Sequence, residues 1–85
     1  MYLGITLDFI KKRVRQFQEK KLNEILSKIQ FHQHMKNQLK QKLEGVTNND
    51  NATKIREEIK FNDKMMEIWQ RNEEKLRRQM SKMED

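Results

Sequence analysis

The sequence predicts an all-α fold, an antiparallel helical hairpin, on three observations. Helix formers fill the chain: proline is absent, glycine occurs only at Gly4 and Gly45, and Lys, Glu, Gln, Leu and Met dominate. Apolar residues recur at alternating intervals of three and four, which is typical of helices that pack against each other. Turn-forming residues gather in one stretch, EGVTNNDNAT at 44–53. Residues 1–85 are therefore expected to form a single helical domain, with a first helix over 5–44, a turn over 45–52 and a second helix over 53–83.

The predicted turn contains residues with distinct local preferences. Gly45 suits the left-handed conformation that often follows a helix, and residues 48–51 favour turns. Thr47, with Asp50 three residues later, or Thr53 alone is expected to cap the second helix.

The second helix carries a seam of mainly apolar positions that runs without a break over more than four heptads. Phe61, Met65 and Ile68 lie about 100° round the helix from this seam, so the apolar face is too wide for one partner helix. The predicted seam consists of Ala52, Ile55, Ile59, Asn62, Met66, Trp69, Glu73, Leu76, Met80 and Met83.

The first helix carries a matching seam, flanked by Leu26, Phe31 and Met35. Upstream, an apolar stripe keeps the same spacing as far as Phe17, but Ile25 lies eight residues further on, so the stripe changes phase near 18–21. Such a stutter alters the winding of a helix without ending it. The seam comprises Leu22, Ile25, Ile29, His32, Lys36, Leu39, Leu43 and Val46, and the upstream stripe comprises Leu3, Leu7, Ile10, Val14 and Phe17.

Folding the arms about residues 48 and 49 sets residues whose numbers sum to about 97 opposite each other. This register places Leu39 near Ile59 and Ile29 near Trp69. His32, opposite Asn62, is expected to form a polar layer that fixes the register.

Two helices cannot cover the broad apolar faces, so a homodimer, forming a four-helix bundle or coiled coil, is expected. The residues assigned to the core or the dimer interface are Ile25, Ile29, Phe31, Met35, Leu39, Ile55, Ile59, Phe61, Met65, Met66, Trp69 and Leu76.

Residues 1–17 form an apolar and basic overhang, because residue 12 would lie opposite residue 85. The overhang is expected to pack on the other subunit, to fold back as a short extra helix after Gly4 with Thr6 as its cap, or to dock on a partner or lipid surface. Packing in the dimer is favoured over external docking.

The net charge of +6 belongs to the first half of the chain. Residues 1–44 hold ten Lys or Arg against four Asp or Glu, whereas residues 45–85 hold nine against nine. The register brings Lys20 and Lys21 level with Arg77 and Arg78, which extends a basic patch at the open end of the hairpin and would steer anionic partners. The patch consists of Lys11, Lys12, Arg13, Arg15, Lys20, Lys21, Arg77 and Arg78.

The sequence contains no pattern of catalytic chemistry. It has no Ser/His/Asp or Cys/His set and no glycine-rich phosphate loop. His32 and His34 are two residues apart and point to different sides of a helix, and the chain has no cysteine for a thiolate zinc site. We therefore assign no catalytic, cofactor-binding or metal-binding residue and expect neither an enzyme nor a small-molecule substrate.

These features predict a small, non-enzymatic regulator or adaptor that binds an acidic partner protein through the open end of its hairpin. The alternative is a dimer that binds DNA or RNA non-specifically through the same basic patch, and a membrane surface ranks behind both. The absence of cysteine and of a signal peptide predicts a cytoplasmic location, and the basic run from Lys11 to Arg15 leaves a nuclear one open. The partner-binding residues are expected to be Leu3, Leu7, Ile10, Arg13, Arg15, Phe17, Met80 and Met83.

Overall fold

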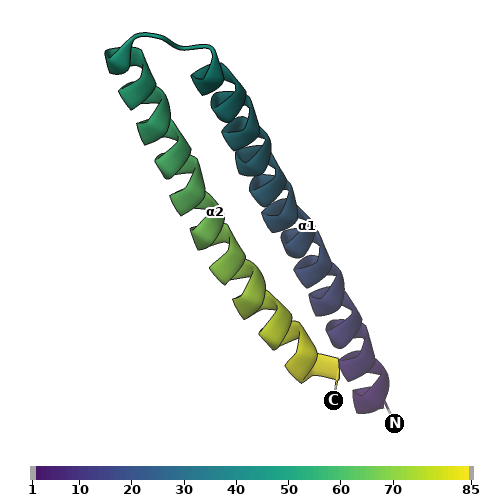
Figure 1. Cartoon of the computed structure of the whole chain (residues 1–85). Helices are drawn as coiled ribbons and strands as arrows, with labels where there is room; N and C mark the ends of the chain where they lie inside the picture. The colour runs from purple at the N-terminus through teal and green to yellow at the C-terminus, as the bar shows by residue number, and fades with distance from the viewer. Residues whose placement is uncertain (1, 85) are drawn as a thin grey trace.

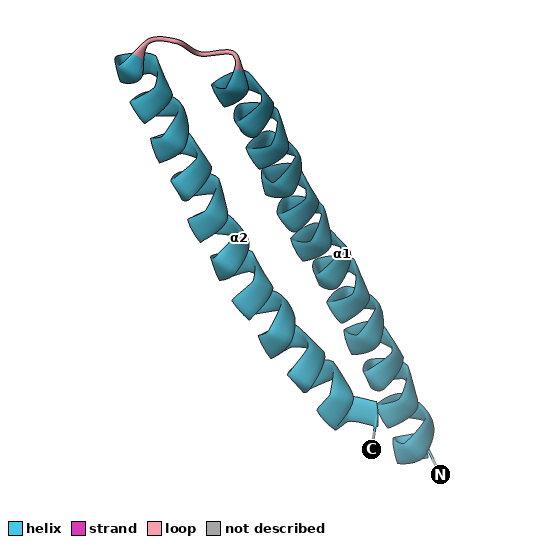
Figure 2. Ribbon diagram, viewed as in Figure 1, coloured by secondary structure: helices cyan, strands magenta, loops and turns pink. Residues whose placement is uncertain are grey.

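The chain forms a hairpin of two long antiparallel helices, seen in a computed structural model that describes the backbone of residues 2–84 and the side chains of residues 7–83 (Figure 1). Helix α1 spans Tyr2–Glu44 and helix α2 spans Asn49–Glu84. The two helices pack along their length within an envelope of 72 × 15 × 13 Å. Figure 2 shows helix and one connecting loop, with no strand in the described part of the chain. The predicted all-α hairpin is confirmed.

Helix α1 is continuous from Tyr2, so the short extra helix after Gly4, one of the three alternatives for the overhang, is not formed. The predicted stutter near 18–21 does not interrupt it, as expected. The change of phase appears in the side chains: Gln18 is half-buried and continues the seam, whereas Phe17 is 66% exposed. The apolar stripe and the contact seam therefore separate at this point.

The turn is shorter than predicted because α2 begins earlier, whereas α1 ends at Glu44 in a tight turn. The amides of Gly45 and Val46 donate to the carbonyls of Lys42 and Leu43, each at 3.2 Å, which closes the helix with bonds to the third residue back. No described residue has a positive φ, so the left-handed conformation expected at Gly45 is wrong.

Helix α2 begins at Asn49 rather than at residue 53, because Asn48 caps it. The Oδ1 of Asn48 accepts a hydrogen bond from the Asp50 amide at 2.8 Å, and its carbonyl accepts one from the Ala52 amide at 3.0 Å. The prediction of a threonine cap is therefore wrong. Thr53 lies inside the helix, where its hydroxyl donates to the carbonyl of Asn49 at 2.9 Å.

The seams predicted on both helices are the contact surface. Every member of both seams is buried or half-buried, and among the other described residues of α2 all but Met65 are exposed. No described side chain is less than 2% exposed, because two helices shield one another along a single stripe. The buried members are Ile25, His32, Leu39, Ala52, Ile55, Asn62, Met66 and Leu76.

The short loop shifts the register of the two helices by about one seam position from the predicted one. His32 bonds to Asn62, and 32 and 62 sum to 94; the helix ends at 44 and 49 sum to 93. The predicted sum of about 97 is therefore wrong, and this register places Leu39 level with Ile55 instead of Ile59. As a result, α2 reaches further along α1 than predicted, and the overhang is shorter.

The hairpin has two unlike faces. In an antiparallel pair, the residue immediately before a seam residue lies on the same side of the hairpin on both helices, and the residue immediately after it lies on the other. Two surface hollows support this assignment, since the non-seam residues that line them all directly precede a seam residue: Lys21, Asn72, Lys75 and Gln79 in one, and Lys42, Asn51, Lys54 and Glu58 in the other.

We call the side that precedes the seam the apolar face, because it carries Phe17, Phe31, Met35, Phe61, Met65 and Ile68. On the opposite side, between residues 19 and 81, every residue that directly follows a seam residue is polar except Leu26. The hairpin is therefore amphipathic as a whole, beyond the amphipathicity of each helix.

Over the part of the chain that the structure describes, neither helix has an apolar stretch long enough to cross a bilayer.

Candidate partner-binding surface

The open end of the hairpin carries large apolar side chains on α1 that α2 does not cover. Leu7 is 55% exposed, Phe9 59%, Ile10 50% and Phe17 66%. We call these four residues the end patch. Phe17 stays exposed because Gln18 takes its place in the contact between the helices. Leu7, Phe9 and Ile10 stay exposed because the register sets Met83, the last side chain of α2 that the structure describes, level with Lys11. The side chain of Leu3, which was also predicted to bind a partner, lies outside the described residues.

The end patch is interleaved with positive charge. The guanidinium of Arg13 lies over the ring of Phe9, 5.7 Å from its centroid, one helical turn further along α1. Lys11, Lys12 and Arg15 are exposed in the same turns. A partner that covers these rings would therefore also meet cations.

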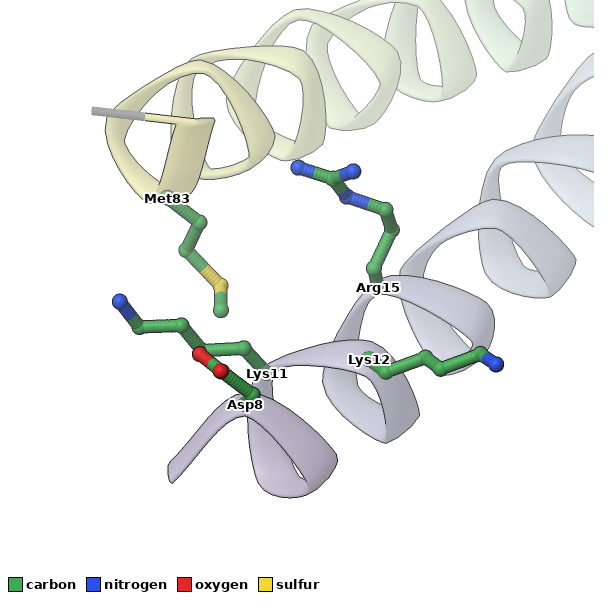
Figure 3. A pocket seen from close by; sticks show the side chains of 5 residues that line it. All are labelled: Asp8, Lys11, Lys12, Arg15 and Met83. Carbon is green, nitrogen blue, oxygen red and sulfur yellow. The ribbon is translucent and has the colours of Figure 1, made fainter. Parts of the chain in front are cut away.

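A hollow of about 210 Å³ lies between the ends of the two helices, lined by Asp8, Lys11, Lys12, Arg15 and Met83 (Figure 3). The side chain of Met83 extends from α2 toward α1, whereas Lys12 extends away from the opening. Among the described side chains, no carboxylate lies within ion-pair distance of Lys11, Lys12 or Arg15.

The arginines of α2 contribute less to the basic patch than predicted. Arg77 donates from Nε to Oε2 of Glu73 at 2.9 Å, and Arg78 lies 3.7 Å from Glu74. The register places these arginines level with residues 16 and 17 instead of Lys20 and Lys21, so the predicted alignment is wrong. Their charges are partly balanced within α2.

Even so, the open end holds nearly all of the net charge. Residues 1–21 contain six Lys or Arg against two Asp or Glu, and residues 71–85 contain five against four, so these segments carry +5 of the total +6. Lys20 and Lys21, with Phe17 and Glu24, line a second shallow hollow further along α1. The positive field is therefore concentrated at one end of a rod.

Met80 and Met83 are half-buried members of the seam. Met83 reaches the basic hollow, whereas the register places Met80 level with Val14, inside the contact between the helices. Two residues that bear on the surface had no assigned role in the sequence analysis. Phe9 lies off the heptad stripe, and the sequence feature that could have identified it is Arg13, four residues later. Gln18 is polar, and only the register reveals that it takes the place of Phe17 in the seam.

The described residues include no group of three His, Asp or Glu side chains placed to hold a metal ion. Comparison with protein-family models, with curated proteins and with solved structures gives no match. The functional argument therefore depends on the geometry of the hairpin.

Proposed function

We propose that this chain is a non-enzymatic helical adaptor or regulator whose open end binds an acidic, partly apolar surface of a partner protein. The observation that carries the proposal is the exposure of the end patch amid a local charge of +5. Aromatic side chains and arginines are enriched in protein interfaces, and the end patch places Phe9 and Phe17 beside Arg13 and Arg15. The absence of cysteine suits a reducing compartment such as the cytoplasm.

The end patch favours a protein over other anionic partners. A nucleic acid backbone would engage the cations and leave Leu7, Phe9 and Ile10 in water. A protein groove with acidic residues at its rim would cover these side chains and pair with Arg13 and Arg15, whose guanidinium groups match carboxylates in geometry.

The test uses the full chain without knowledge of the natural partner. A random peptide phage library is selected on the wild type, and the enriched peptides are measured by calorimetry against the double variant Ile10→Gln/Phe17→Gln. We expect enriched peptides to combine Asp or Glu with Leu, Ile or Phe, and the double variant to weaken binding at least ~10-fold. Gln16→Ala, next to Phe17 but outside the end patch, is the matched control. Peptides that bind the double variant as tightly as the wild type would contradict the proposal.

The second candidate is non-specific nucleic acid binding, favoured by the three cations around the hollow in Figure 3. Its test is fluorescence anisotropy with labelled single-stranded and duplex DNA between about 50 and 200 mM salt. Binding that falls steeply on a log-log plot, and that is lost in Lys11→Glu/Lys12→Glu, would favour this function. No binding at the lowest salt would exclude it.

A further inference from the structure

A second apolar patch lies at the middle of the hairpin, away from the end patch. Phe31 is 55% exposed, Phe61 59% and Ile68 48%, and Met35 and Met65 are half-buried between them. We call these five residues the central patch. The rings of Phe31 and Phe61 both lie edge-on to the imidazole of His32, with centroids 5.2 and 6.5 Å away, so one cluster joins the two helices.

The isolated hairpin exposes too much surface for its mass. A compact monomer of 10.5 kDa exposes about 5,400 Å², whereas this chain exposes 7439 Å², an excess of roughly 2,000 Å². A stable interface of ordinary size covers about 800 Å² on each partner. The hairpin can therefore lose the area that a dimer needs and still expose as much as a compact monomer.

We propose that a second copy of this chain docks on the central patch, antiparallel to the first, about a two-fold axis near Phe31, to form a four-helix bundle. The proposal stands independently of the function proposed for the open end. A two-fold axis brings like patches together, so the aromatic cluster of one copy meets that of the other. The opposite side of the hairpin, almost entirely polar, remains in water.

The limits of the central patch define the area that a second copy would cover. Toward the open end, the apolar face gives way to a belt of charged and polar residues around a hollow of about 240 Å³. Toward the turn, it gives way to the charged and polar residues that line the other hollow. This polar belt separates the central patch from the end patch, so the two patches are distinct surfaces. The belt consists of Lys21, Glu24, Lys28, Asn72, Lys75 and Gln79.

Charge selects the antiparallel arrangement. Parallel hairpins would place two open ends of +5 side by side, which is repulsive. Antiparallel hairpins hold the open ends far beyond the screening length of about 10 Å at 0.1 M salt.

The antiparallel dimer also leaves Leu7, Phe9 and Ile10 of the end patch accessible, whereas Phe17 lies at the edge of the area that a second copy would cover. Residue 31 lies sixteen residues from the turn at 47 and sixteen from residue 15, so the turn of one copy would reach only residue 15 of the other. The segment before residue 15, with Leu7, Phe9 and Ile10, would project at each end of the dimer. The bundle would therefore present two identical partner-binding ends at opposite poles.

Sedimentation equilibrium tests the docking face with a matched pair of variants, since Ile68 and Gln70 flank Trp69 on opposite faces and are both exposed. We expect the wild type to sediment at twice the chain mass of 10.5 kDa. Ile68→Glu should raise the dimer dissociation constant at least ~100-fold, whereas Gln70→Glu should change it less than about 3-fold. A wild type that stays monomeric at high micromolar concentration, or two variants with equal effects, would overturn the proposal.

Spin-label distances test the arrangement even if Ile68→Glu fails to fold. The chain has no cysteine, so a single label at Gln16→Cys, an exposed site on α1, reports only the distance between copies. Gln16 lies fifteen residues from the proposed axis, so thirty residues at 1.5 Å each separate the labels by about 45 Å. A distance below about 20 Å, as parallel hairpins require, or no dipolar coupling at all, would overturn the antiparallel dimer.

Discussion

The imidazole Nδ1 of His32 lies 2.8 Å from Oδ1 of Asn62, in the middle of the mainly apolar contact between α1 and α2. Both residues are buried, at 8% and 7% exposure. Because the amide nitrogen of Asn62 donates to the carbonyl of Glu58 at 2.8 Å, its Oδ1 is the acceptor and Nδ1–H of His32 the donor. Any slip of the helices would separate this pair and leave two buried polar groups unpaired, so the bond favours one register.

The first prediction concerns this polar pair. Asn62→Leu should lower the free energy of unfolding by about 1–3 kcal/mol, because the buried Nδ1–H loses its acceptor. His32→Leu/Asn62→Leu should recover most of the loss, since it removes both polar groups. Urea denaturation at one fixed protein concentration measures both variants. A double variant less stable than the single variant would show that His32 stabilises the hairpin by more than its hydrogen bond with Asn62.

The second prediction concerns the start of α2. Asn48→Ala should cost about 1 kcal/mol, because the amide of Asp50 loses the side-chain oxygen that caps it. Thr47→Ala should change stability by less than about 0.5 kcal/mol, as is usual at exposed sites that provide no cap. Thermal unfolding followed by circular dichroism distinguishes the two. Equal losses, or a larger loss for Thr47, would place the cap where the sequence suggested it.

The third prediction concerns the ion pair between Lys36 Nζ and Asp63 Oδ1, at 2.6 Å. The carboxylate is 47% exposed and so partly screened by water. Asp63→Asn should therefore destabilise the protein by no more than about 1 kcal/mol, and the difference should shrink in 0.5 M salt. Chemical denaturation at two salt concentrations checks this. A larger loss that salt leaves unchanged would mean that the pair is shielded from solvent.

The fourth prediction uses the single tryptophan. Nε1 of Trp69 is buried without a hydrogen-bond partner among the described residues. Trp69→Phe should keep the free energy of unfolding within about 1 kcal/mol of wild type, because the loss of apolar area is offset by removal of an unpaired donor. Trp69→Ala should cost at least ~2 kcal/mol, because it empties part of the seam. A comparable loss in Trp69→Phe would indicate that Nε1 finds an acceptor in solution.

Much of the fold was predictable from heptad spacing, because one period fixes which side of each helix is buried. The seam from Ala52 to Met83 is buried or half-buried throughout, and His32 pairs with Asn62 as expected, although the predicted sum of about 97 would set these two residues about three positions apart. The register was missed because it depends on loop length, which depends in turn on the cap. Asn48 and Thr53 both belong to the residue types that cap helices, and the choice between them decides whether α2 begins at Asn49 or after residue 53.

The surface at the open end was predictable in part. Exposure of Ile10 was foreseeable from the overhang, and that of Phe17 from the change of phase near 18–21. The ion pairs of Arg77 and Arg78 with Glu73 and Glu74 follow from a spacing of four residues on one helix, a signal present in the sequence but not used. Which residues of α1 and α2 share one face of the hairpin could be predicted only with the register, since each face is built from both helices.

The central claim is that the two apolar patches differ in role: a second copy covers the central patch, whereas Leu7, Phe9 and Ile10 of the end patch are left open. Hydroxyl-radical footprinting of the full chain, read by mass spectrometry at about 1 μM and about 500 μM, measures both patches in one experiment. We predict that Phe31, Phe61 and Ile68 become protected as concentration rises, while Leu7, Phe9 and Ile10 stay reactive. Equal reactivity of Phe31 and Phe61 at both concentrations, or protection that begins at the end patch, would contradict the account.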